Sequence, residues 1–133
     1  MKISELIRLA QEARKNAYCP YSHFAVGAAV VSKTGHTYTG ANVENASYGL
    51  TVCAERTAIF KAVNAGDLEL ETLCLAGSDA GYTYPCGACL QVMAEFAPHL
   101  NVIVTDRGGH FKEHKLEELL PFQFQFDVEE KIL

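Results

Sequence analysis

Apolar residues recur along this chain with two periods, one typical of helices and one typical of strands. Near the N-terminus they recur every three or four positions, which predicts a helix that is capped by Ser4 and fades at residues 19–20. The apolar face of this helix contains Leu6, Ile7 and Ala10. The same period predicts three further helices, at residues 53–65, 86–96 and 116–120.

Runs rich in small and β-branched residues lie between these segments. They predict strands at residues 24–32, 36–40, 72–76, 101–105 and 110–112. Because helices alternate with strands, we expect an α/β domain with helices on both faces of a mixed sheet. No repeat, low-complexity tract or linker interrupts the pattern, so residues 1–133 are expected to form a single domain.

Composition narrows the classes of protein that fit this pattern. The 133 residues are 49% hydrophobic, enough for one core, and the formal net charge of −5 disfavours a nucleic-acid partner. The longest nearly unbroken apolar stretch, residues 24–31, is far shorter than the ~20 residues of a membrane-spanning helix. The N-terminus has no apolar leader, and five cysteines are an odd number. We therefore expect a soluble, cytoplasmic protein with reduced thiols.

Three of the cysteines stand at predicted helix starts. Cys86 and Cys89 form a Cys-x-x-Cys pair at one start, which by itself fits either redox chemistry or metal binding. Cys53 opens another predicted helix in the same way, and three converging thiolates suit zinc. Structural zinc sites usually have four protein ligands, whereas catalytic sites keep three and leave one position for water. Cys19 is the rival fourth ligand, and Cys74, within a predicted strand, is expected to be a buried thiol.

Glu55, two residues after Cys53, adds a carboxylate to this constellation. Taken alone it is an ordinary acidic residue in the first turn of a helix. Together with the run Pro85-Cys86-Gly87-Ala88-Cys89, however, it has the spacing of the zinc nucleoside and nucleobase deaminases, with Cys53 in place of their leading His. Four stretches of the chain look like successive signatures of one family, in the same order: residues 18–24, 40–48, 53–58 and 118–121. With them the chain resembles the small homotetrameric cytidine deaminases over nearly its whole length.

This resemblance implies a fold, a cofactor and a reaction. The fold is a three-layer α-β-α sandwich with a five-stranded mixed sheet, and one Zn²⁺ per subunit is held by Cys53, Cys86 and Cys89. The reaction is hydrolytic deamination of cytidine and deoxycytidine to uridine and deoxyuridine with release of ammonia. Glu55 is expected to take a proton from water, deliver it to N3 and help to protonate the leaving amine. Three thiolates on Zn²⁺ leave a charge of 2 − 3 = −1, which Arg56 is expected to offset by donating to the ligand sulfurs.

The resemblance also implies how the nucleoside is held. Asn42 and Glu44 would hydrogen-bond the ribose 3′-hydroxyl, although a plain polar loop explains the same two residues. Phe24 would stack on the pyrimidine, although a Phe at this position is also typical of a core. The backbone N–H of Ala54 would meet O2 of the base.

Tyr48 and Phe124 would reach the site of a neighbouring subunit in the homotetramer. For Phe124 the alternative is a half-buried strand, since Phe and Gln alternate over residues 122–126. The chain also departs from the family pattern. Leu90 stands where an Arg is usual, Tyr84 stands where a Ser is usual, and the bulk of Phe122 near the inferred interface makes it a rival for the role of Phe124.

Two other functions remain open at this point. The first is a related zinc deaminase that acts on a nucleoside-like antibiotic or on cytosine in a polynucleotide, and both the net charge and Glu44 speak against a polynucleotide. The second is a non-catalytic zinc-stapled binding module with Cys19 as the fourth ligand. The expected partner is a small nucleoside, with no nucleic acid and no membrane.

Overall fold

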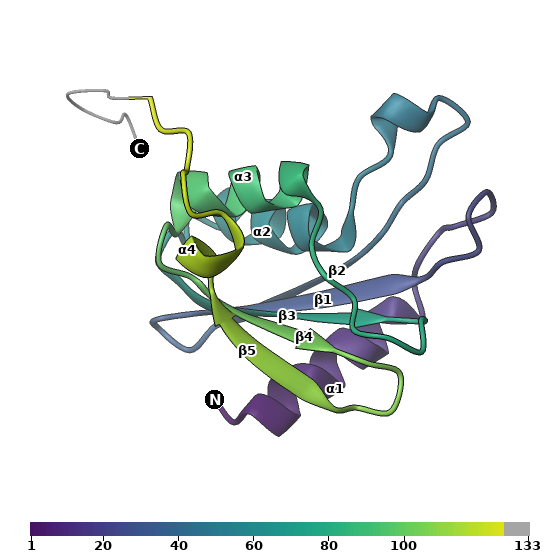
Figure 1. The fold of residues 1–133 in the computed structure, drawn as a ribbon, viewed down its shortest axis with the longest axis horizontal. Coiled ribbons are helices and arrows are strands. Elements are labelled where there is room, and N and C mark those ends of the chain that lie inside the picture. Colours follow the sequence, from purple (N-terminus) through teal and green to yellow (C-terminus); the bar gives the residue numbers. More distant parts are fainter. Residues whose placement is uncertain (127–133) are drawn as a thin grey trace.

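The computed structural model describes residues 1–126 and has a five-stranded mixed sheet at its centre (Figure 1). The strand order is β2-β1-β3-β4-β5; β3 and β4 are parallel, and the other neighbours are antiparallel. The mixed sheet predicted from the sequence is therefore confirmed. The strands are β1 Val26–Ser32, β2 Thr37–Ala41, β3 Leu70–Gly77, β4 Asn101–Thr105 and β5 Phe111–Lys115.

Helices cover both faces of the sheet. In Figure 1, α1 lies below the sheet, while α2, α3 and the short α4 lie above it. This is the predicted three-layer sandwich. The helices are α1 Ile3–Arg14, α2 Ala54–Asn64, α3 Gly87–Phe96 and α4 Leu116–Leu119, with a single 3₁₀ turn, η1, at Tyr48–Leu50. None of the helices within residues 1–126 is long and apolar enough to span a membrane.

The sheet divides the core into two parts, and strand β1 contributes to both. Successive side chains of a strand point to opposite faces, so Ala28 and Val30 pack with α2 and α3, whereas Ala29 and Val31 pack with α1. Because β1 is covered on both faces, it is apolar at nearly every position instead of alternating between apolar and polar residues.

Two glycines allow the helices to approach the sheet closely. A Cβ on Gly40 of β2 would lie 2.6 Å from the backbone nitrogen of Ala58 and 2.7 Å from the carbonyl oxygen of Ala54, both in α2. A Cβ on Gly27 of β1 would lie 2.0 Å from the carbonyl oxygen of Ala10 in α1. Any side chain at Gly40 would push away the helix that begins at Cys53.

Some predicted boundaries are wrong. The N-cap of α1 is Lys2, whose carbonyl accepts the hydrogen bond from the N–H of Leu6, so Ser4 lies inside the helix and does not cap it. Strand β5 continues to Lys115 because its ladder with β4 extends to the pair Asn101 and Lys115, although its residues are polar and mostly exposed. Residues 122–126 form no strand.

Candidate active site

The starts of α2 and α3 bring the three predicted cysteine ligands together. Cys53 and Cys86 are the N-cap residues of the two helices, both with extended backbone, and Cys89 lies in the first turn of α3. The two helices pack side by side on one face of the sheet, with Cys89 buried and Cys53 half-buried at the edge of the core between them. As a result, all three Sγ atoms lie within 4.8 Å of one another.

This geometry fits zinc. A tetrahedral ion with Zn–S bonds of about 2.3 Å places its sulfurs about 3.8 Å apart, and the Sγ atoms of Cys86 and Cys89 are 3.6 Å apart. Free N–H groups at the helix starts also favour thiolates. Over residues 1–126, Cys19 does not join this group, and Cys74 is buried in β3, where burial raises its pKa to about 12. A cluster of three ligands leaves a position open for water, as in catalytic zinc sites.

Arg56 lies against the cluster. Its Nη2 donates to Cys53 Sγ at 3.3 Å. The pKa of Cys53 is lowered to about 5, first by a hydrogen bond with Cys89 and then by the Arg56 guanidinium, against the opposing effect of burial. The same hydrogen bond, together with burial, raises the pKa of Cys89. Cys53 is therefore a thiolate near neutral pH, and the neighbouring cation stabilises its charge.

Glu55 is a buried carboxyl group beside the cluster, with 4% of its surface exposed. Burial, as the larger cause, and the nearby Cys53 thiolate together raise its pKa to about 7. A carboxyl group with a pKa near the working pH can both accept and donate protons, which is what general acid–base catalysis requires. An ordinary acidic residue in the first turn of a helix would be exposed and ionised.

A cavity of about 300 Å³ opens beside the helix starts. It gathers seven of the residues predicted from the sequence: Phe24, Asn42, Glu44, Cys53, Ala54, Glu55 and Cys86. Five further residues complete its lining: Ser22, Val26, Thr51, Thr83 and Tyr84. The cavity lies beyond the carboxyl end of β3, where open α/β sheets commonly bind ligands.

The polar side chains of the cavity are held by its walls. The Asn42 amide accepts a hydrogen bond from the N–H of Val26 and donates one to the carbonyl of Phe24, both at 2.9 Å. The Glu44 carboxylate accepts hydrogen bonds from the Ser22 hydroxyl and from backbone N–H groups. These bonds, that of the Ser22 hydroxyl first, lower the pKa of Glu44.

Sequence reasoning assigned no role to Ser22, although it lies inside one of the family-like stretches. Besides its bond to Glu44, its hydroxyl oxygen accepts a hydrogen bond from the N–H of Phe24 at 3.0 Å. The next residue, His23, has a left-handed backbone with φ of 59°, a conformation uncommon outside glycine. A non-glycine residue with positive φ beside a cavity is a sign of a functional loop, but the sequence does not reveal φ.

Two of the residues predicted to bind the nucleoside, Tyr48 and Phe124, lie outside the cavity of their own chain. Tyr48 is 75% exposed and packs edge-on against Tyr21, with ring centroids 6.0 Å apart, in an adjoining hollow. Phe124 is 70% exposed, and only its carbonyl is tied down, by Gln91 Nε2 at 2.9 Å. Phe122 is 94% exposed, so the half-buried strand considered for this segment is wrong.

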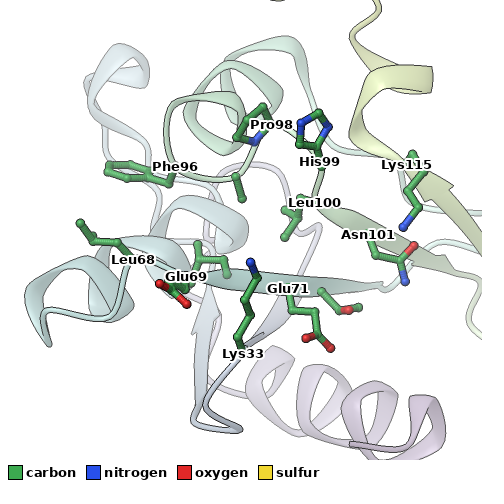
Figure 2. Close-up of a pocket in the computed structure, with 13 residues that line it drawn as sticks. Lys33, Leu68, Glu69, Glu71, Phe96, Pro98, His99, Leu100, Asn101 and Lys115 are labelled. Carbon is green, nitrogen blue, oxygen red and sulfur yellow. The ribbon is translucent and has the colours of Figure 1, made fainter. Parts of the chain in front are cut away.

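A larger cavity, of about 500 Å³, lies at the opposite end of the sheet. Figure 2 shows Lys33 pointing toward its centre, with the Glu69 and Glu71 carboxylates to either side of Lys33 and Lys115 near Asn101. It combines two cations with two anions. It contains none of the residues predicted from the sequence.

Comparisons with known proteins agree with this site. The family model for the cytidine and deoxycytidylate deaminase zinc-binding region matches residues 1–105. A cytidine deaminase from Halalkalibacterium halodurans is 48% identical over 120 residues, covering 90% of this chain and 91% of the relative. A more distant relative, the blasticidin-S deaminase of Bacillus cereus, is 29% identical over 128 residues, covering 90% of each chain.

Among solved structures, the cytidine deaminase from Burkholderia pseudomallei has a TM-score of 0.90 at 46% identity, with 93% of this chain and 100% of the other covered. The match therefore extends over nearly the whole chain. The chain belongs to the cytidine and deoxycytidylate deaminase family.

Proposed function

We propose that this protein is a zinc-dependent hydrolase that deaminates free cytidine and deoxycytidine to uridine and deoxyuridine, releasing ammonia. Family membership supports the reaction class. The observation that carries the proposal is that the buried carboxyl of Glu55 lines the same cavity as two of the three clustered cysteines. We further propose that residues 1–133 form one catalytic domain and that, with all five thiols free, it works in the cytoplasm.

Cys53, Cys86 and Cys89 would hold one zinc ion per chain. When bound, zinc supplies a water acidic enough to ionise near neutral pH. The guanidinium of Arg56, already bonded to Cys53, would draw charge from the ligand sulfurs. Leu90 stands where the family usually has an Arg, but it is uncharged and packed into the core. We therefore assign this charge compensation to Arg56.

Glu55 would carry the protons. It accepts one from the attacking water and delivers it to N3 of the base, which makes C4 more electrophilic. It then accepts the remaining hydroxyl proton and passes it to the 4-amino group, which leaves as ammonia. Burial suits Glu55 to this work, since a pKa of about 7 allows both states near neutral pH.

The walls of the cavity would hold the nucleoside. Glu44, an ionised acceptor, and the Asn42 amide, which has a second N–H to offer, would bind the ribose 3′-hydroxyl. Phe24 would stack on the pyrimidine, and the Ala54 N–H would meet O2. A volume of about 300 Å³ is at the low end for ligand cavities, which suits a small nucleoside.

Neighbouring subunits would complete the site. Tyr48 and Phe124 are large exposed side chains without a role in their own cavity, which supports a homotetramer in which they reach adjacent sites. Mass measurement in solution tests the tetramer. Phe124→Ala and Phe122→Ala, assayed side by side, show which of the two tail residues affects turnover.

The deciding experiment is an assay of ammonia release with zinc content measured in the same samples. We expect conversion of cytidine and deoxycytidine, weak conversion of cytidine 3′-phosphate, whose phosphate would meet Glu44, and none of a cytosine-containing oligonucleotide. Glu55→Gln should retain zinc and lose turnover. Conversion of neither nucleoside by zinc-loaded protein would refute the proposal, as would a preference for the oligonucleotide or for a nucleoside antibiotic.

A further inference from the structure

Tyr84 links the cavity to a part of the molecule for which no role has been given. It precedes Cys86 by two residues, in a segment, residues 78–86, that has neither helix nor strand. One side of Tyr84 lines the cavity that contains Glu55. Because Cys86 belongs to the same segment, a contact that fixes Tyr84 also restricts the position of the Cys86 thiol.

The Tyr84 side chain is held by His114 of β5. Its hydroxyl and His114 Nε2 are hydrogen-bonded at 3.1 Å. The two rings also pack together, with centroids 5.5 Å apart and planes inclined by 49°. This pair joins the 78–86 segment to β5, thirty positions further along the chain.

His114 is itself held in place. In the sheet it pairs with Val102 of β4, and only 22% of its side chain is exposed. Its Nδ1 lies 3.7 Å from a carboxylate oxygen of Glu118, while the other oxygen of Glu118 accepts the N–H of Lys115 at the start of α4. The imidazole is therefore oriented by the sheet on one side and by α4 on the other.

We propose that Tyr84 is a positioning residue: clasped by His114, it fixes one wall of the nucleoside cavity and the position of Cys86. The expected effect on substrate binding rests on the proposed function, whereas the expected effect on the metal cluster does not. Two further contacts with the sheet are made by residues that precede Tyr84: the N–H of Thr83 donates to the carbonyl of Thr105 at 3.1 Å, and the Lys112 ammonium of β5 lies 4.6 Å from the centroid of the Tyr82 ring. Loss of the Tyr84–His114 contact should therefore make both the cavity wall at Tyr84 and the position of the Cys86 thiol less fixed.

The test uses Tyr84→Phe, which keeps the ring and removes the hydroxyl, His114→Phe, which keeps a ring and removes the nitrogen, and the double variant. The matched control is Tyr38→Phe. Tyr38 also donates a hydrogen bond, to Asp67 at 3.0 Å, but it lines no part of the cavity. The readouts are KM and kcat for cytidine, the rate of zinc loss to a chelator, and thermal stability.

We expect Tyr84→Phe to raise KM about fivefold, the worth of one hydrogen bond, with kcat within about twofold of the wild type. Zinc should leave about fivefold faster. The double variant should be no worse than the more affected single variant, because the two residues act as one unit. Tyr38→Phe should change stability alone.

Unchanged KM and unchanged zinc loss in Tyr84→Phe would overturn the proposal. So would effects of the two single variants that multiply in the double variant, or equal effects in Tyr38→Phe. If the wild-type protein deaminates no nucleoside, the proposed function fails. The comparison of zinc loss between Tyr84→Phe and Tyr38→Phe still decides the role of the Tyr84–His114 contact.

Discussion

The two ends of the sheet carry cavities of opposite character. The larger, about 500 Å³, combines Lys33 and Lys115 with Glu69 and Glu71 on its surface (Figure 2). The smaller, about 300 Å³, has a buried carboxyl group and thiols that converge to within 4.8 Å of one another. We propose that the chemistry takes place in the smaller cavity, so convergence and burial, and not volume, are the features that point to the candidate site.

Helix direction explains the difference. The starts of α2 and α3 lie at the smaller cavity, where free backbone N–H groups and the positive end of the helix dipole favour thiolates. The larger cavity is lined by the end of α3, at Phe96, where carbonyl groups face outward. A helix end of that polarity gives no support to an anionic metal ligand.

The largest expected effect is the loss of the metal cluster. Cys53→Ser should abolish zinc binding and lower kcat/KM by at least about a thousandfold, since each thiolate is one of only three ligands. Cys19→Ala should keep both, as Cys19 lies outside the cluster. Metal analysis and the deamination assay measure this pair. Loss of zinc in Cys19→Ala would instead indicate a closed structural site.

Glu55→Gln and Glu69→Gln compare a carboxyl group from each cavity. Glu55→Gln should lower kcat about 10²- to 10⁴-fold with zinc retained, whereas Glu69→Gln should leave kcat unchanged. Glu55→Gln should also stabilise the fold at pH 8, because it removes a buried charge. Denaturant unfolding in the presence of a chelator measures the chain's own contribution.

The pH dependence of that gain follows from the pKa of Glu55, raised from 4.5 to about 7. Below pH 4.5 the carboxyl is protonated in both the folded and the unfolded state, so the substitution changes little. Between 4.5 and 7 the unfolded state ionises first, and the cost of burial grows. Above pH 7 the carboxyl is ionised in both states, and the free-energy cost of burying its charge reaches its full value, on the order of 3 kcal/mol. A gain that is equal at pH 4 and pH 8 would contradict this account.

The third prediction concerns the cations of the two ends. Arg56→Gln should weaken zinc binding about 10- to 100-fold, because the Cys53 thiolate loses its hydrogen-bond donor. Lys33→Gln, in the larger cavity, should have no effect on zinc. Competition with a chelator measures both. Equal zinc affinity in the two variants would show that the ligand sulfurs need no such donor.

The smallest effect is expected from a hydroxyl at each end. Ser22→Ala frees Glu44 and should raise KM for cytidine about fivefold with kcat unchanged. With a 2′,3′-dideoxycytidine substrate the increase should vanish, since Glu44 then has no 3′-hydroxyl to bind. Thr34→Ala, in the turn at the other end of β1, is the control. A KM increase that persists with the dideoxy substrate would place the role of Ser22 elsewhere.

The parts predicted well were those in which local pattern and tertiary structure agree. Strand β4 has the predicted bounds, 101–105, because its three central residues, 102–104, are β-branched, apolar and buried. The starts of α2 and α3 lie at Cys53 and Cys86, as their motifs indicated. Ser4 was a wrong cap because a good capping residue does not decide the helix start when the hydrogen-bond ladder can begin earlier, at Lys2.

The remaining features depend on contacts between distant segments. Strand β5 is polar, so only its pairing with β4 shows how far it extends. The Asn42 amide makes two hydrogen bonds with the backbone of Phe24 and Val26, and no local sequence pattern could show them. The Tyr84 and His114 pair joins residues of different segments in the same way.

The sequence by itself determined the element types, the three thiols, the general acid–base candidate and the family, because these depend on residue identity and short spacings. Only the tertiary structure decided that the helix starts converge, that Glu55 is buried enough to have a pKa of about 7, and that Tyr48 and Phe124 are exposed and lie outside their own cavity. Distance and desolvation are properties of the packed chain, and they convert a list of reactive residues into a site.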